Sequence, residues 1–140
     1  MKLKIGIIGF GNMGSGHARN LTAGSIPEAE LTAICDIDAE RRAAAREKYP
    51  EIPAFENAGD LYKSGLCDAV LIAVPHYDHS PLAIAAFAHG LHVMTEKPAG
   101  VYTKQVIDMN NAAAKSGKVF GIMYNQRTNP VYIKLRDMVK

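Results

Sequence analysis

Short apolar runs alternate with segments of helical periodicity along this chain. The apolar runs predict β-strands at residues 3–8, 31–35, 69–74, 92–95 and 119–124. Helical patterns fall between them, at residues 13–21, 39–48, 80–89 and 103–115. The only proline within these helical segments, Pro81, stands in a first turn, where proline is tolerated. The alternation predicts an α/β fold, a doubly wound parallel sheet with helices on both faces.

Two segments depart from this alternation. Residues 49–66 contain Pro50, Pro53 and Gly59, which predict irregular chain with a short helix near residues 60–63. From Pro130 onward, apolar residues recur at helical spacing, and no glycine or proline ends this last helix before Lys140. We therefore expect residues 1–140 to form one domain that is part of a longer protein.

The first predicted strand leads through a glycine-rich turn into the first predicted helix. In a G-x-G-x-x-G turn the first glycine permits a tight turn, the second lets the backbone approach a pyrophosphate, and the third lets the helix pack closely. The helix N-terminus adds free N–H groups and a partial positive charge. Such turns also serve as simple connections, so a second signal is needed. The candidate phosphate-binding residues are Gly9, Phe10, Gly11, Asn12, Met13 and Gly14.

The end of the second strand supplies that signal. Asp36 follows the glycines by about twenty residues, where a carboxylate accepts hydrogen bonds from a ribose diol. This spacing predicts a Rossmann fold that binds a dinucleotide, and a carboxylate here favours NAD over NADP. Asp36 could instead cap the next helix, although Asp38 is equally able to do so. Arg41 and Arg42 keep NADP open because an arginine here can hold a 2′-phosphate, while Arg41 is also a candidate to cover the adenine.

An ionisable pair, Glu96 and Lys97, follows the strand predicted at residues 92–95. A lysine beside a carboxylate and a substrate hydroxyl can orient that hydroxyl and help to move its proton. The same pair could equally be a surface ion pair at a turn. The pair lies at the carboxyl edge of the sheet, where open α/β folds bind ligands, and from this motif alone both interpretations stay open.

The histidines invite other interpretations. His76 and His79 flank Asp78, but a metal site needs three or four ligands and we expect none here. His79 is expected to begin a helix and pack near the cofactor, and His76 to face substrate. His17, on the first helix, is interpreted as a packing or surface residue.

Composition narrows the class of partner. The chain has 140 residues, 48% of them hydrophobic, and a formal net charge of only +2 with charges of both signs interspersed. No basic face for nucleic acid or an anionic membrane is evident, and glycines interrupt the first apolar run before it could span a membrane. Cys35 and Cys67 lack metal or redox spacing, so we expect reduced, buried thiols in a cytoplasmic protein that binds a small molecule.

Taken in order, the motifs resemble the N-terminal domain of the Gfo/Idh/MocA family, the glucose-fructose oxidoreductase and inositol dehydrogenase group. The motifs are Gly9-x-Gly11-x-x-Gly14, Asp36, Asp68-Ala69-Val70, Pro75-x-x-x-His79, Gly90-x-His92-Val93, Glu96-Lys97-Pro98 and Asn125-x-Arg127-x-x-Pro130. The resemblance implies NAD(P)-dependent redox chemistry at a sugar or cyclitol hydroxyl, with Lys97 as the catalytic lysine.

The same resemblance assigns further roles. It places Val74 and Pro75 beside the nicotinamide ribose and makes Glu96 a cofactor-facing carboxylate. His79 and Asn125 become cofactor-binding positions and Arg127 a substrate-facing one, and the Lys97–Pro98 bond becomes a candidate cis peptide.

The family also implies a second domain, an antiparallel sheet whose Asp and His complete the active site and which mediates homo-oligomerisation. The 140-residue chain alone is therefore expected to be inactive. Two other functions stay open: a dinucleotide-sensing regulator, which would not need Lys97, and a glycosidase that uses NAD transiently. A methyltransferase is disfavoured, because three glycines followed by Asp36 fit a pyrophosphate and two riboses better than S-adenosylmethionine.

Overall fold

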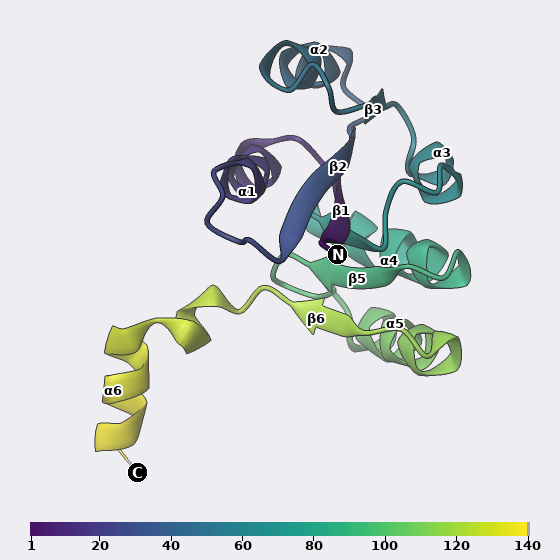
Figure 1. Ribbon diagram of the computed structural model, residues 1–140. Helices are drawn as coiled ribbons and strands as arrows, with labels where there is room; N and C mark the ends of the chain where they lie inside the picture. Colours follow the sequence, from purple (N-terminus) through teal and green to yellow (C-terminus); the bar gives the residue numbers. More distant parts are fainter. Residues whose placement is uncertain (140) are drawn as a thin grey trace.

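A six-stranded parallel sheet forms the centre of the molecule (Figure 1). The computed structural model describes residues 1–139. The strands lie in the order β3-β2-β1-β4-β5-β6, which confirms the predicted doubly wound Rossmann fold. Their bounds are β1 (Leu3–Ile8), β2 (Ala29–Cys35), β3 (Ala54–Phe55), β4 (Ala69–Ile72), β5 (His92–Thr95) and β6 (Phe120–Ile122).

Helices cover both faces of this sheet. One face carries α1 (Asn12–Thr22) and α2 (Ala39–Lys48); the other carries α3 (Ala58–Lys63), α4 (His79–Ala88) and α5 (Thr103–Ser116). Two short 3₁₀ turns, η1 (His76–Asp78) and η2 (Asn125–Thr128), follow β4 and β6. The predicted helices are therefore present, with ends that differ by one or two residues.

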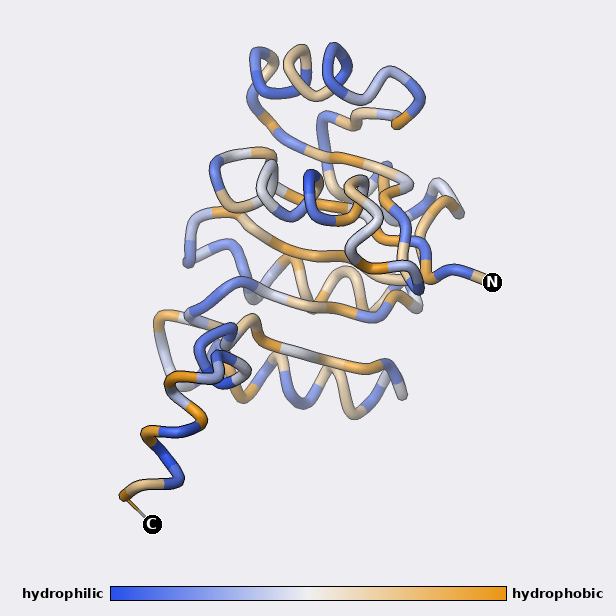
Figure 2. Tube along the Cα trace, turned by 60° about the vertical axis from the view of Figure 1, so that its left-hand side comes forward, coloured by the Kyte–Doolittle hydropathy of each residue, from blue (hydrophilic) through white to orange (hydrophobic). Residues whose placement is uncertain are grey.

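Each face has its own hydrophobic core. Ile7, Ile34 and Leu71 pack under α1 and α2, whereas Val70 and Ile72 pack under α3, α4 and α5. Alternate residues of the central strands therefore serve opposite cores, as the period of two along a strand requires. In Figure 2 the hydrophobic colour is concentrated along these strands, which lie inside the layers of helices.

The segment predicted to be irregular contains a strand. Ala54 and Phe55 form β3 by pairing with Ile34 and Cys35 of β2. Two residues are too few to show a strand period, so only pairing with β2 defines this element. The short helix after it begins at Ala58, earlier than expected.

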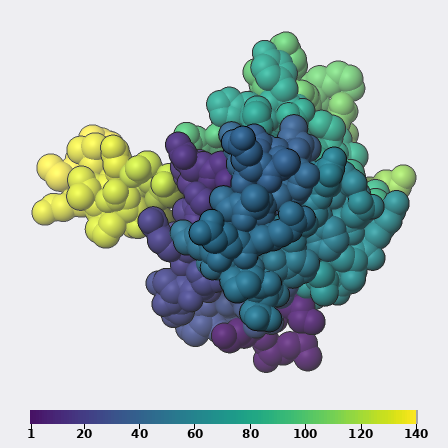
Figure 3. Space-filling view, turned by 90° about the horizontal axis from the view of Figure 1, so that it is seen from above, coloured from purple at the N-terminus to yellow at the C-terminus, as the bar shows by residue number. Residues whose placement is uncertain are grey.

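The last helix, α6 (Pro130–Met138), extends away from the sheet (Figures 1 and 3). Asn129 caps it by accepting a hydrogen bond from the Val131 N–H at 3.0 Å, and Pro130 occupies the first turn. None of its described residues is buried, and large apolar side chains including Leu135 are exposed. No helix among residues 1–139 is long and apolar enough to cross a membrane.

Candidate functional site

The chain path changes direction between β1 and β4, which are neighbours in the sheet. After β1 the Gly9 N–H donates to the Cys35 carbonyl at 2.7 Å, toward β2. After β4 the Ala73 N–H donates to the Ile8 carbonyl at 2.7 Å. The connections that follow lead to opposite faces, and in open α/β folds the crevice at such a point binds the ligand.

The three glycines of residues 9–14, here called the glycine loop, have different roles. Gly9 has φ of +92°, and a Cβ there would lie 2.5 Å from the Ala73 carbonyl oxygen. A Cβ on Gly14 would collide with the Gly9 carbonyl oxygen. A Cβ on Gly11 would meet nothing closer than Arg41 Nη1, at 3.6 Å. The fold therefore requires the first and third glycines, whereas the second leaves open space in front of α1.

The N-terminus of α1 faces that space with unsatisfied donors. Gly11 is its N-cap residue and provides no side-chain cap, and the first turn contains no acidic residue. By contrast, Asp38 caps α2 by accepting hydrogen bonds from the N–H groups of Glu40 and Arg41. The first turn of α1 is thus available to an anion, which the helix dipole also favours.

The Asp36 carboxylate joins the end of β2 to the glycine loop. It is only 6% exposed, and it accepts hydrogen bonds from the Phe10 N–H at 2.6 Å and the Asp38 N–H at 2.9 Å. The Phe10 side chain is buried in the core, edge-on to the ring of Tyr49. Because Asp38 caps α2, Asp36 is free of that role and lies at the mouth of the crevice.

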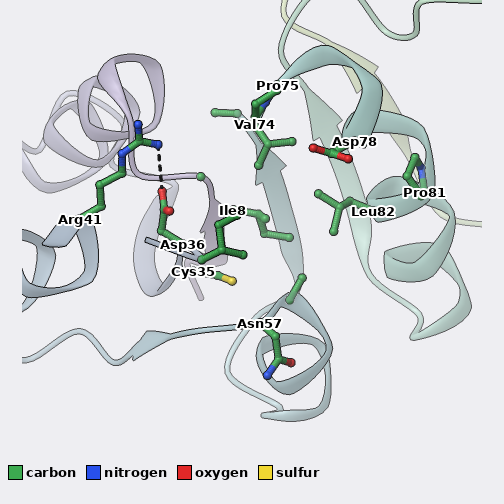
Figure 4. A pocket seen from close by; sticks show the side chains of 14 residues that line it. Ile8, Cys35, Asp36, Arg41, Asn57, Val74, Pro75, Asp78, Pro81 and Leu82 are labelled. Carbon is green, nitrogen blue, oxygen red and sulfur yellow. Dashed lines mark ion pairs between the residues drawn. The ribbon is translucent and has the colours of Figure 1, made fainter. Parts of the chain in front are cut away.

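Arg41 and Arg42, the two arginines that could hold the 2′-phosphate of NADP, make different contacts. Arg42 Nη1 donates to the carbonyls of Asp36 and Ile37, at 3.0 and 2.9 Å, and its Nη2 pairs with Glu56 at 3.1 Å. Arg41 remains half exposed, with Nη1 at 3.7 Å from Asp36 Oδ2 (Figure 4). Only Arg41 therefore presents its guanidinium to a ligand beside Asp36.

A pocket of about 530 Å³ opens between the ends of β1 and β2 and the loop after β4 (Figure 4). Asp36 and Arg41 lie on one side of it, and Asp78 lies on the other. Most of the remaining wall is apolar, which suits a flat heteroaromatic ring with its ribose at the carboxylate. The lining residues are Ile8, Gly9, Cys35, Asp36, Ile37, Arg41, Asn57, Ala58, Ala73, Val74, Pro75, Asp78, Pro81 and Leu82.

Buried protonated groups lie in and behind this wall. Burial, with the neighbouring Asp36 carboxylate acting in the same direction, raises the pKa of Cys35 to about 12. Burial likewise raises the pKa of Tyr62, whose hydroxyl donates to the Leu82 carbonyl at 2.9 Å. The Cys35 thiol is thus neutral at physiological pH. Cys67 is only partly buried, contrary to expectation, and burial also raises the pKa of its thiol.

Residues 96–98, here called the lysine turn, follow β5. The Lys97–Pro98 bond is cis, as predicted. Glu96 is buried, with Oε1 at 2.7 Å from His17 Nε2, and its Oε2 accepts a hydrogen bond from the Lys97 N–H at 3.3 Å. The Lys97 side chain is exposed. His17 is partly buried, which agrees with its interpretation as a packing or surface residue, but its contact with Glu96, 79 residues further along the chain, leaves no sequence signal.

His79 connects the lysine turn to the loop after β4. It begins α4, as expected, and it is fully buried. Its Nδ1 lies 2.7 Å from the Pro98 carbonyl oxygen and its Nε2 lies 2.9 Å from the Val74 carbonyl oxygen. His76 is exposed in η1, with its ring 5.8 Å from that of His79.

The structure brings together some predicted site residues and separates others. Asn12 and Met13 are exposed in the first turn of α1. Asn125 and Arg127 lie in η2, and Arg127 lines a separate hollow of about 420 Å³ beside α6. Of the predicted residues, Gly9, Asp36, Arg41, Val74 and Pro75 line the main pocket. Residues 1–139 contain no group of three or more His, Cys, Asp or Glu side chains placed to hold a metal ion.

Sequence analysis missed much of the pocket wall. Three polar residues of the wall were not predicted as site residues: Cys35, Asn57 and Asp78. Asn57 is also the N-cap of α3. The apolar residues that were not predicted are Ile8, Ile37, Ala58, Ala73, Pro81 and Leu82. Apolar side chains of this kind give no chemical signal, and only the fold brings them to one pocket.

These features define a dinucleotide-binding Rossmann domain. The profile of the Gfo/Idh/MocA oxidoreductase family, described as having an NAD-binding Rossmann fold, matches residues 3–124. The chain therefore belongs to this family, and the predicted family and NAD as the family's cofactor are confirmed.

Curated relatives point to one enzyme group. Inositol 2-dehydrogenase of Corynebacterium glutamicum is 34% identical over 144 residues, covering 99% of this chain and 41% of the relative. Myo-inositol 2-dehydrogenase of Thermotoga maritima is 31% identical over 138 residues, which cover 99% of this chain and 41% of the relative. The chain thus spans about two fifths of the length of these relatives.

Solved structures agree with the fold. Scyllo-inositol dehydrogenase from Lactobacillus casei, with bound NAD(H) and scyllo-inositol, superimposes with a TM-score of 0.90 at 27% identity, over 99% of this chain and 41% of that one. The WlbA dehydrogenase from Bordetella pertussis, in complex with NADH and UDP-GlcNAcA, has a TM-score of 0.92 at 27% identity. The match covers 99% of this chain and 42% of that one.

Proposed function

We propose that this chain is the cofactor-binding part of a dehydrogenase that transfers a hydride between NAD and a hydroxyl-bearing carbon of a cyclitol or sugar. One observation carries the proposal: the lysine turn lies at the same sheet edge as the glycine loop, joined to α1 by the contact between His17 and Glu96. The names of the inositol dehydrogenase relatives support the substrate class.

The residues present fit NAD. The space over Gly11 and the uncapped N-terminus of α1 suit the pyrophosphate, with Asn12 and Met13 contributing backbone donors and Phe10 holding the loop through its N–H bond to Asp36. We assign the adenosine ribose to Asp36 and the adenine to the apolar pocket beside Arg41. Arg42 is engaged by carbonyls and Glu56, and Asp36 would repel a 2′-phosphate, so NAD is favoured over NADP.

The nicotinamide half would extend past Val74 and Pro75 toward the lysine turn, with Asn125 also contributing. Bound NAD would accept or return the hydride. Lys97 would hold the substrate hydroxyl and transfer its proton, and its exposed side chain is available for that role. His76 and Arg127, both exposed, would face the substrate. A pure dinucleotide sensor would not need Lys97.

The relatives are longer, and we propose that the complete protein has a second domain that supplies further active-site groups and mediates homo-oligomerisation. Exposed apolar residues of α6, including Val131, Leu135 and Met138, are available to pack against it. The two free thiols, Cys35 and Cys67, accord with a proposed cytoplasmic location.

The test uses the complete protein with Lys97→Ala and, as a control, Lys104→Ala, an exposed lysine on α5 that pairs with Asp108. We expect Lys97→Ala to lower kcat for the best cyclitol or sugar by about 100-fold or more, the scale of general acid–base catalysis. NADH affinity should change by less than about threefold, since Lys97 acts on the substrate. The 140-residue chain should bind NADH without turnover. Full activity in Lys97→Ala would contradict the proposal.

A further inference from the structure

The buried carboxylate of Glu96 links α1 to the lysine turn. Its Oε1 contacts His17 Nε2 at 2.7 Å, and its Oε2 accepts the hydrogen bond from the Lys97 N–H at 3.3 Å. The side chains of His17 and Glu96 are 16% and 7% exposed, so water competes only weakly for this contact. A partly desolvated contact of this kind orients its partners far better than a surface pair does.

The alternative partner for Glu96 is its own neighbour. A Glu–Lys ion pair was one interpretation of the sequence, and it would engage the Lys97 amine. Within residues 1–139 the side-chain partner of Glu96 is His17 instead. His17 therefore occupies the carboxylate oxygen that would otherwise be open to Lys97.

We propose that His17 is a positioning residue that acts through Glu96: it keeps the lysine turn in place and leaves the Lys97 amine free for substrate. Because His17 lies on α1, whose N-terminus is the proposed phosphate site, this contact also couples cofactor binding to the lysine turn. The inference rests on the proposed function and names a residue to which that function assigned no role.

The coupling follows from what happens to Glu96 when His17 is removed. The carboxylate would remain buried with only the long hydrogen bond from the Lys97 N–H, and a buried charge without its partner is unfavourable. It would turn toward water or toward the Lys97 ammonium, and either movement shifts the lysine turn. A glutamine at position 17 would retain a donor near the position of Nε2.

The experiment combines NADH titration with amide hydrogen exchange on the 140-residue chain. The variants are His17→Ala, His17→Gln, Glu96→Gln and the double variant His17→Ala with Glu96→Gln. His89→Ala is the control, since His89 is exposed and its ring contacts the Ala85 carbonyl within its own helical turn. Cooperative urea unfolding checks that each variant is folded.

We expect His17→Ala to weaken NADH binding about tenfold and to accelerate exchange of the Lys97 amide about tenfold. His17→Gln should recover most of both losses, and His89→Ala should change neither. In the Glu96→Gln background, adding His17→Ala should change NADH affinity by less than about twofold. The effects of two substitutions that remove the same contact are not additive.

Unchanged NADH affinity and Lys97 exchange in His17→Ala would overturn the inference, as would additive effects in the double variant. If the unsubstituted chain fails to bind NADH, the proposed function is contradicted instead. In that case Lys97 amide exchange in the absence of cofactor still decides the role of His17: acceleration in His17→Ala with rescue by His17→Gln supports it, and no change refutes it.

Discussion

The glycine loop and the lysine turn lie at the same edge of the sheet, but different forces hold them. The glycine loop depends on backbone sterics, since a Cβ on Gly9 or Gly14 would strike a carbonyl oxygen. The lysine turn depends on side chains from other elements, His17 from α1 and His79 from α4. The glycine loop leaves no room for an added atom at Gly9 or Gly14, and the lysine turn requires particular hydrogen-bonding groups to be present.

This difference predicts how each region fails. An added methyl group strains the glycine loop itself, whereas removal of an imidazole leaves buried partners near the lysine turn unsatisfied. Loss of function without loss of fold is therefore expected only where the structure leaves open space or exposed groups. Within the glycine loop, Gly11 is such a position.

The largest expected effect comes from Gly9→Ala. The positive φ should contribute about 1–2 kcal/mol of backbone strain, and the Cβ placed 2.5 Å from the Ala73 carbonyl oxygen about 1–3 kcal/mol of overpacking. Together they should lower the free energy of unfolding by roughly 4 kcal/mol. Urea unfolding measures this cost. Gly24→Ala is the matched control, because Gly24 also has positive φ but a Cβ there meets nothing within 4 Å. Equal losses in the two variants would show that the carbonyl contact is unimportant.

Next is His79→Ala, which should destabilise the chain by about 3 kcal/mol through a cavity and the loss of the ring's polar contacts with two carbonyl oxygens. The carbonyls are those of Val74 and Pro98. In the same urea assay the exposed His89→Ala should cost less than about 1 kcal/mol. A loss no larger than that of His89→Ala would mean that His79 does not hold the two loops together.

A third substitution, Gly11→Val, should separate binding from folding. Its Cβ fits, since the nearest atom is Arg41 Nη1 at 3.6 Å, and stability should stay within about 1 kcal/mol of the parent. NADH affinity should fall at least about 100-fold, or about 2.7 kcal/mol, because the side chain fills the pyrophosphate approach. Gly16→Val, at an open position of α1, is the control for the valine itself. Parental NADH affinity in Gly11→Val would place the pyrophosphate elsewhere.

The smallest effect is expected from Asp36→Ala. Loss of the ribose contact and of the hydrogen bond to the Phe10 N–H should weaken NADH binding about tenfold, or about 1.4 kcal/mol. The preference for NADH over NADPH should narrow or reverse as the negative charge disappears. Asp38→Ala should lose about 1 kcal/mol of stability as a helix cap while keeping NADH affinity. Calorimetry showing tighter NADPH binding to the unsubstituted chain would refute the assignment.

Local patterns predicted the parts of the site that local geometry builds. The glycine loop, Asp36 and the capping role of Asp38 were all visible as spacings near strand ends. β3 was not, because its two residues become a strand only beside β2. The contact between His17 and Glu96 was not predicted for the same reason, since Glu96 follows β5, far along the chain from α1.

The fold class and the glycine loop could be predicted from the order of residues alone, because periodicity and backbone strain act between residues close in the chain. Which polar groups meet depends on how distant elements pack: Glu96 contacts His17, His79 contacts two carbonyls, and Arg42 contacts the end of β2. Each of these side chains had several possible partners in sequence. Burial selects among them, because a polar group removed from water must find its hydrogen bonds wherever the packing of strands and helices brings a partner.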